Sequence, residues 1–241
     1  NPKPVVDKWA EWEANPKPFG GLEVLAKIKK AKESGATDLD LNANQITDLS
    51  PLAGLTNLKR LGLSYNKISD LSPLKGLTNL GLLELAQNQI TDLSPLAGLT
   101  NLYWLRLNEN QISDISALKG LTNLKVLTLV KGRITDVSPL KGLTNLEHLD
   151  LNKNKISDIS PLRGLTNLKV LTLTSNHFID IFHLKGLTKL EKLHLGVNKI
   201  TNFASLKELT KLKYLDLAYI NFSEEQKAML EKALPNCKIL F

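Results

Sequence analysis

The sequence predicts an α/β solenoid, an elongated stack of strand and turn units, from three observations. A 22-residue unit recurs without a change of spacing from residue 36 through most of the 241-residue chain. Each copy opens with LxxLxL, whose alternation is typical of a strand with one buried face. Most copies then reach Ser-Pro-Leu, which favours the start of a short helical turn. Because such units contact only their neighbours, the whole length is expected to form one elongated domain.

Residues 1–35 precede the repeats and are expected to form a helical cap over the open end of the core. The segments Val5–Glu13 and Leu22–Glu33 have helical composition and are separated by prolines and glycines. The second segment is predicted to place four apolar side chains on one side, at Leu22, Leu25, Ile28 and Ala31. Trp9 and Trp12 are interpreted as cap packing, with a binding role as the alternative.

Residues 36–222 hold eight full units and a ninth strand. The units begin at Ala36, Leu58, Leu80, Leu102, Leu124, Leu146, Leu168 and Leu190, and the ninth strand begins at Leu212. Within a unit, positions 1, 4, 6 and 11 are expected to be buried, whereas positions 2, 3, 5, 7 and 8 project from or flank the sheet. The asparagine at position 9 is expected to bond backbone groups of a buried turn. The serine before proline is expected to cap a 3₁₀ turn, so the side opposite the sheet is narrow and the arc is open.

Residues 223–241 are predicted to close the stack with a helix and a last strand. Ser223 and Gln226 have the spacing of a capping box, and the final CKILF alternates like a strand.

The unit N-Q-I-T/S-D-L-S-P-L-A-G-L-T-N-L resembles the 22-residue leucine-rich repeat of internalin-type bacterial proteins over residues 36–222. The resemblance implies a parallel sheet on the concave face, 3₁₀ turns on the convex side and protein recognition on the concave face. It also favours a secreted or cell-surface bacterial protein. The single cysteine, Cys237, excludes a disulfide framework but fits a cytoplasmic protein equally well.

The net charge of +7 raises the question of a polyanionic partner. Acids and bases nearly balance at the positions that face outward from the sheet, so no nucleic acid is expected there. Much of the excess lies at position 18, on Lys75, Lys119, Lys141, Arg163, Lys185 and Lys207. A solvated edge is the simpler interpretation of this row, and polyanion binding is the alternative. With no run of about 18 apolar residues, no membrane insertion is expected, and the free chain is expected to be a monomer.

Catalytic, metal and cofactor sites are not expected. His148 and His194 lie two units apart, about 9.6 Å along a sheet, which is too far to share a zinc ion. Asp150 lies on the strand of His148, but no serine or cysteine nucleophile accompanies them. The GLTNL glycines are interpreted as part of the repeat rather than as a phosphate loop. A non-enzymatic protein is therefore predicted.

The repeat framework is nearly invariant within the chain, but the outward positions vary. An exposed apolar row that includes Trp104 is expected to be covered by a partner, although valine, threonine and tyrosine also simply suit strands. The predicted partner-binding residues are Tyr65, Leu82, Glu84, Tyr103, Trp104, Arg106, Val126, Thr128, Val130, Lys131, Arg133, His148, Asp150, Val170, Thr172 and His194. For Tyr214 and Tyr219, packing on the closing cap is as reasonable as binding.

Two units depart from the pattern. In the fifth, Gly132 replaces the asparagine, which is predicted to open the backbone and to direct Arg133 toward the concave rim. In the seventh, Phe182 and His183 replace Ser-Pro, either by repacking or as a second contact on the convex edge.

The favoured function is therefore recognition of another protein on the concave face. A spacer module of a larger bacterial surface protein and an engineered binding scaffold are the alternatives.

Overall fold

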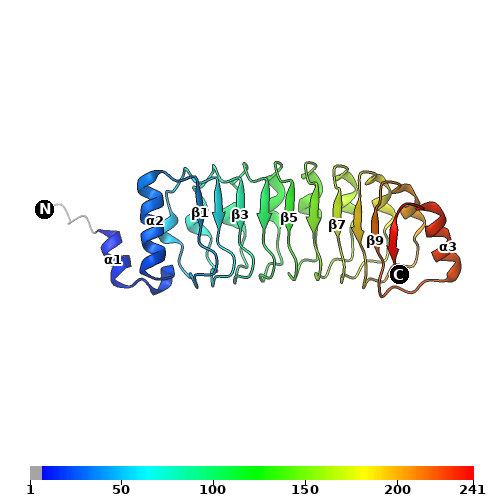
Figure 1. The fold of residues 1–241 in the computed structure, drawn as a ribbon, viewed down its shortest axis with the longest axis horizontal. Helices are drawn as coiled ribbons and strands as arrows, with labels where there is room; N and C mark the ends of the chain where they lie inside the picture. Colours follow the sequence, from blue (N-terminus) through cyan, green and yellow to red (C-terminus); the bar gives the residue numbers. More distant parts are fainter. Residues whose placement is uncertain (1–6) are drawn as a thin grey trace.

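A computed structural model describes residues 7–241, and its ten short strands form one open parallel sheet in chain order. Figure 1 shows the strands side by side along the length of the molecule. Their bounds are β1 Asp38–Asp40, β2 Arg60–Gly62, β3 Leu82–Glu84, β4 Trp104–Arg106, β5 Val126–Thr128, β6 His148–Asp150, β7 Val170–Thr172, β8 Lys192–His194, β9 Tyr214–Asp216 and β10 Lys238–Leu240. From β1 to β9, each strand pairs with the next at a shift of one 22-residue unit, as in Leu82 opposite Trp104. Strand β10 pairs with β9 at a shift of 24 residues, with Lys238 opposite Tyr214.

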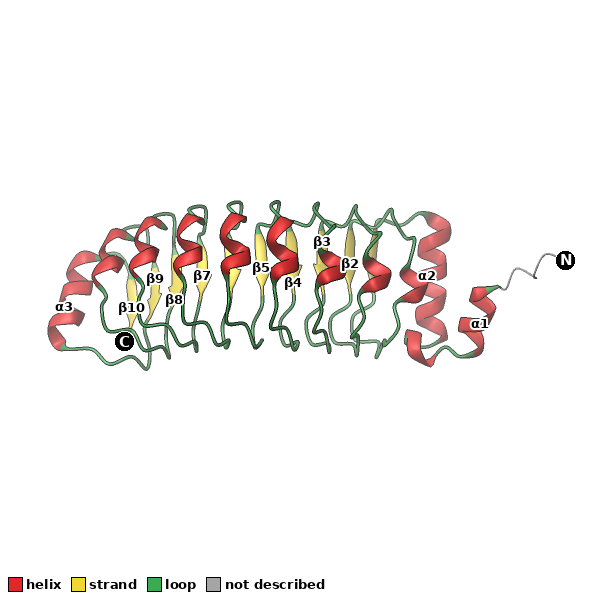
Figure 2. Ribbon diagram, turned by 180° about the vertical axis from the view of Figure 1, so that it is seen from behind, coloured by secondary structure: helices red, strands yellow, loops and turns green. Residues whose placement is uncertain are grey.

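The opposite side of the stack consists of short 3₁₀ turns, as Figure 2 shows from behind the sheet. They are η2 Ser50–Leu52, η3 Ser72–Leu74, η4 Ser94–Leu96, η5 Ser116–Gly120, η6 Ser138–Gly142, η7 Ser160–Gly164, η8 Phe182–Gly186 and η9 Ala204–Glu208. Parallel strands with 3₁₀ turns opposite confirm the predicted solenoid class.

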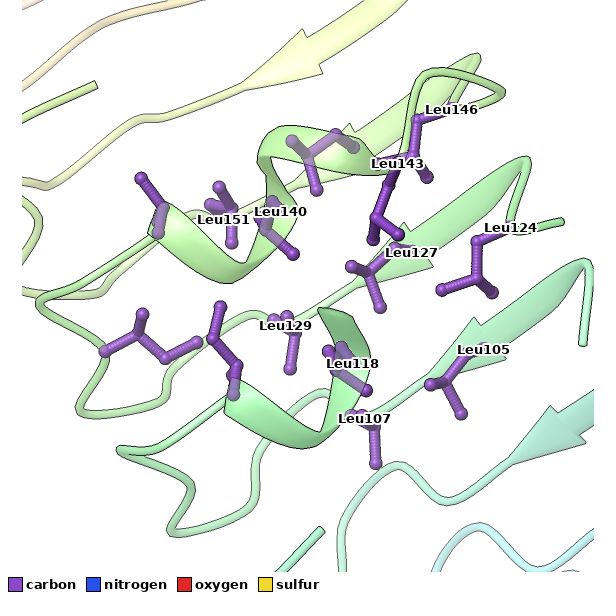
Figure 3. Close-up of a cluster of buried hydrophobic side chains, with 14 of the residues drawn as sticks. Leu105, Leu107, Leu118, Leu124, Leu127, Leu129, Leu140, Leu143, Leu146 and Leu151 are labelled. Carbon is purple, nitrogen blue, oxygen red and sulfur yellow. The ribbon is translucent and has the colours of Figure 1, made fainter. Parts of the chain in front are cut away.

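One continuous leucine core lies between the sheet and the turns. The predicted positions 1, 4, 6 and 11 are buried from the second unit to the eighth, and so are positions 14, 17 and 20 of all eight units. In the first unit, Ala36 and Leu39 at positions 1 and 4 are only half-buried. Figure 3 shows how side chains of neighbouring units interlock, with Leu105 and Leu127 from strands facing Leu118 and Leu140 from turns. Each unit therefore completes its core only against the next, which is why the array stacks.

The position-9 asparagines join neighbouring units, as the sequence predicts for buried turns. The side-chain oxygen of Asn88 accepts from the Ile68 amide of the preceding unit at 2.9 Å. Its side-chain nitrogen donates to the carbonyls of Leu63, Leu85 and Ala86 at 2.9, 3.1 and 3.3 Å. In the fifth unit, Gly132 offers no side chain for these bonds, so the asparagine ladder is interrupted there.

The prediction that serine caps the 3₁₀ turns is wrong. The serine is the first residue of the turn, and its amide donates to the aspartate two residues earlier, as Ser72 does to Asp70 at 2.8 Å. In the eighth unit the side chain of Asn202 accepts from the amide of Ala204 in the same way. The cap is therefore an Asx turn, and asparagine can replace aspartate in it.

The amino-terminal cap consists of α1 (Lys8–Ala14), η1 (Lys17–Phe19) and α2 (Leu22–Ser34). Helix α1 begins one residue after Asp7, and the two valines of the predicted segment lie outside the described residues. Val24, Leu25, Ile28 and Ala31 are buried in α2. Leu22, which was predicted to lie on the same side as Leu25, Ile28 and Ala31, is 56% exposed and does not share their burial. Trp9 packs against the core, and Trp12 lies next to the buried Phe19, with ring centroids 5.8 Å apart.

The carboxyl end is closed by α3 (Glu224–Ala233) and β10. The predicted capping box is present, since Ser223 and Gln226 each accept from the backbone amide of the other. Leu230 and Leu234 are buried against the last unit.

Candidate functional site on the concave sheet face

The concave face is formed by the side chains at positions 3 and 5 of each strand, since position 4 points into the core. Two parallel rows result, and their members lie directly opposite each other on adjacent strands. Position 3 places Leu82, Trp104, Val126, His148 and Val170 in one row. Position 5 places Glu84, Arg106, Thr128, Asp150, Thr172 and His194 in the other. Eleven of the sixteen predicted residues are therefore brought together on one surface.

The position-3 residues from Leu82 to Val170, called the apolar ridge below, cross five adjacent strands. Trp104 is 37% exposed, and the other four are half-buried. Neighbours stand about 4.8 Å apart, so the ridge is about 19 Å long. These side chains lie outside the leucine core, and their apolar surface is available to a partner.

Tyr103 projects beside the ridge because the neighbouring strand lacks a side chain. A Cβ atom on Gly81 would lie 2.6 Å from the ring of Tyr103, so the ring occupies the space that glycine leaves. Tyr103 remains 38% exposed. Tyr103, just before β4, and Trp104, its first residue, thus place two exposed aromatic side chains at adjacent positions of the chain.

The position-5 residues differ in how much polar surface each of them exposes to a partner. Arg106 is exposed, and within residues 7–241 it takes part in no ion pair. Thr172 is only 9% exposed, and the hydroxyls of Thr128 and Thr172 are buried without a hydrogen-bond partner in the described chain. Arg106 therefore offers the larger polar contact, whereas the two threonines contribute mainly the shape of the surface.

The two predicted histidines sit in different environments. Burial lowers the pKa of His148, and the nearby Lys192 lowers it further, although Asp150 acts in the opposite direction. His148 is thus neutral at pH 7 and offers a hydrogen bond rather than a charge. His194 already faces Asp216, with Nδ1 and Oδ2 3.4 Å apart.

The remaining predicted residues lie on the rim beyond the strands. Position 8 has a left-handed backbone in all nine units, although no glycine is present, and it carries Tyr65 and Lys131 with φ of 60° and 58°. Tyr65 is 53% exposed. Lys131 pairs with Glu109 at 2.9 Å, an exposed contact of at most about 1 kcal/mol.

Two predictions about this rim are wrong. Position 7 does not project throughout, because Ser64 and Ala86 are buried, and Val130 is half-buried with its amide bonded to Asn108. Gly132 does not open the backbone either. The amide of Arg133 still donates to the Ile112 carbonyl at 2.8 Å.

The concave face contains a hollow that the sequence did not predict, and the predicted last strand extends the face by one strand. A hollow of about 460 Å³ lies at the amino-terminal end, above Gly62 and beside Leu82 and Glu84. Gly62 is the only glycine in the position-5 row, and this missing side chain is the feature of the sequence that could have indicated the hollow. Strand β10 extends both rows, so that Leu240, 44% exposed, lies opposite Asp216.

On the convex side, the irregular seventh unit keeps its 3₁₀ turn. The amide of Phe182 donates to Asp180 at 2.8 Å, as serine does elsewhere. The Phe182 and Ile179 side chains are 53% and 56% exposed, and the Lys185 ammonium lies 3.9 Å from the centroid of the Phe182 ring. Burial of Phe178 explains one change in this unit, but repacking does not explain the exposed pair.

Within residues 7–241, no group of three or more histidine, cysteine or acidic side chains is placed to hold a metal ion. The helices of the same described part are all too short or too polar to span a bilayer.

Comparison with known proteins agrees with this architecture. A family model described as Leucine Rich repeats (2 copies) matches residues 37–76, 100–142 and 144–186. An internalin (inlF) from Listeria monocytogenes has 34% identity and a TM-score of 0.84, over 93% of this chain and 76% of that one. Internalin C2 from the same organism has 34% identity and a TM-score of 0.80, over 83% and 95%. The search of curated proteins found no match.

A more distant similarity is to the ectodomain of the Arabidopsis thaliana receptor kinase GASSHO1/SCHENGEN3, solved in complex with CASPARIAN STRIP INTEGRITY FACTOR 2. It has 26% identity and a TM-score of 0.65, over 76% of this chain and 24% of that one. The stacked units thus define a leucine-rich repeat solenoid. The chain belongs to the leucine-rich repeat family and is of the internalin type found in bacteria.

Proposed function

We propose that this protein is a non-enzymatic binding protein that recognises another protein through its concave face. The observation that supports this most directly is the apolar ridge. Its side chains are excluded from the core, yet they place a tryptophan and aliphatic groups in line across five strands. The plant receptor ectodomain of the same fold, solved with a bound factor, is a precedent for recognition by such a scaffold.

In this proposal Trp104 is the anchor, and Leu82, Val126 and Val170 surround it. Tryptophan is enriched among interface residues whose truncation costs more than about 1 kcal/mol of binding, and such residues are ringed by contacts that exclude water. Arg106, unpaired within the described chain, fixes the orientation of the partner through a charged hydrogen bond.

Photo-crosslinking tests the proposal because it captures a partner directly from a mixture of proteins. Benzophenylalanine is placed at Val126 on the ridge, or at Ser116 on a convex turn as the matched control, and each protein is exposed to a native extract. A specific adduct is expected from the first position only. The captured partner is then purified, and its affinity for Trp104→Ala is expected to fall by more than about 1 kcal/mol while the array stays folded.

The alternative role as a spacer makes the opposite prediction. If the concave position yields no adduct, or if the captured partner binds Trp104→Ala as tightly as wild type, the ridge is not a recognition surface. Circular dichroism of the variant separates loss of the contact from loss of the fold.

A further inference from the structure

Five consecutive 3₁₀ turns, η5 to η9, carry a basic residue at the same position of the unit. These residues, called the convex basic row below, are Lys119, Lys141, Arg163, Lys185 and Lys207. All five are exposed, and none takes part in an ion pair within residues 7–241. The turns stack side by side on the face opposite the sheet (Figure 2), so the five charges stand in single file.

Another row of the same chain shows that like charges are not an unavoidable result of the repeat. At position 2, Lys125, Glu147, Lys169, Glu191 and Lys213 alternate in sign along the stack. Lys169 reaches Glu147, and Lys213 reaches Glu191, each at 2.6 Å. The hydrogen bond and charge of Lys169 lower the pKa of Glu147. Four of the five position-2 charges thus pair with each other, whereas the convex basic row has no such pairs within residues 7–241.

The acids nearest in sequence to the convex basic row are largely engaged elsewhere. Asp114, Asp136, Asp158 and Asp180 lie five residues before the basic residue of their turn and accept the amide that opens that turn. In the last of the five turns, Glu208 follows Lys207 directly. The row therefore presents cations without ion-pair partners, one of which, Lys185, lies over the Phe182 ring, and in the first four turns the nearest carboxylates are held at the other end of the turn.

The glycine after each of the first four basic residues has no visible structural reason. A Cβ atom on Gly120 or Gly142 would meet nothing within 4 Å, and on Gly164 or Gly186 it would be 3.9 Å from one carbonyl. None of the four has a positive φ. Glycine costs up to about 1 kcal/mol relative to alanine in a helical turn. Gly98 has the same open surroundings after Ala97, so this glycine belongs to the repeat as a whole, and in the basic row it leaves the backbone accessible to a ligand.

We propose that the convex basic row binds a linear anionic glycan, separately from the partner on the concave face. A basic side chain on each of five successive turns matches an extended polymer with a charge on successive units. Nucleic acid is the less favoured occupant because single strands need aromatic platforms for their bases. The one exposed aromatic ring beside the row in the described chain, that of Phe182, is covered by Lys185.

Binding of fluorescent heparin and polygalacturonate oligosaccharides to the whole chain tests this inference. Each ionic contact with a single-stranded polyanion contributes about −0.7 to the slope of the logarithm of the binding constant against the logarithm of the salt concentration. Five contacts are therefore expected to give a slope of about −3.5. The triple variant K141A/R163A/K185A is expected to reduce that slope by about 2 and to weaken binding at least about tenfold. The control K125A/K169A/K213A removes the same charge from the position-2 row and is expected to change affinity less than about threefold.

A second variant, G142A/G164A, distinguishes an effect of the glycines on oligosaccharide binding from an effect on the stability of the fold. It is expected to weaken oligosaccharide binding while its thermal midpoint stays at or above that of wild type. Three results would overturn the inference: no binding at about 0.15 M salt, equal losses in the two triple variants, or oligothymidylate binding as tightly as the glycans. Unchanged binding in G142A/G164A would remove the glycines from the site.

Discussion

Replacing Asn88 with alanine is expected to lower the free energy of unfolding by about 3 to 5 kcal/mol. The Ile68 amide would lose its acceptor inside the core, which costs about 1–3 kcal/mol. The side chain would also lose its bonds to Leu63 and Leu85 at 2.9 and 3.1 Å, each worth about 1 kcal/mol. Those carbonyls keep another asparagine as donor, so they add no further desolvation penalty.

Asn79 provides a matched control with the same chemical change. Its exposed side chain makes a single bond, to the Thr56 carbonyl at 2.8 Å, so its replacement by alanine is expected to cost at most about 1 kcal/mol. Both variants are unfolded in urea at pH 7 and followed by circular dichroism. A loss below about 1 kcal/mol for Asn88→Ala, or equal losses for the two variants, would refute the role assigned to the ladder.

Three further predictions concern the turns. Gln87 has a left-handed backbone with φ of 54°, so Gln87→Gly is expected to raise the free energy of unfolding by about 0.5–1 kcal/mol. Gln89 does not have a left-handed backbone, so Gln89→Gly is expected to lower the free energy of unfolding by a similar amount. A change of the same sign in both variants would contradict this prediction. The Ser72 hydroxyl and amide lower the pKa of Asp70, so the stability that the ionised Asp70 contributes is full above about pH 4 and is lost as the pH falls. Asp70→Asn is expected to reduce this loss of stability in acid, measured by urea titrations at several pH values, because Asn202 already forms the same cap without a titrating group. An unchanged pH profile in the variant would contradict the prediction. Phe182→Ser is expected to change the unfolding free energy by less than about 0.5 kcal/mol because the ring is 53% exposed, and a larger loss in thermal unfolding would show that the ring packs.

The fold could be predicted nearly completely from the sequence because the unit is reinforced in every copy. Strand spacing, the 3₁₀ turns and the asparagine bonds all follow from a pattern that cannot slip without exposing leucine. Features that depend on a single residue were less predictable. Leu22 has the right spacing for the buried side of α2, but Val24 takes that role.

The concave rows were also predictable, because alternation along each strand decides which residues face outward. How much of each side chain is available was not predictable, because this depends on the neighbouring strands. Thr172 has the sequence position of Arg106, yet its smaller side chain is covered. Tyr103 owes its position to Gly81, one strand and 22 residues away.

The missing asparagine at Gly132 has a consequence for how the molecule comes apart. From the first unit to the eighth, every other junction between neighbouring units is tied by a position-9 asparagine. The junction between the fourth and fifth units keeps two other asparagine bonds, from the Val130 amide to Asn108 and from Asn145 to the Thr122 carbonyl, but it has no position-9 bond. Local opening is therefore expected to stop or start at this more weakly tied junction. This seam runs beneath the ridge, between Trp104 on one side and Val126 on the other. A ligand that contacts both strands would hold the fourth and fifth units together, and its binding would slow amide hydrogen exchange in both units.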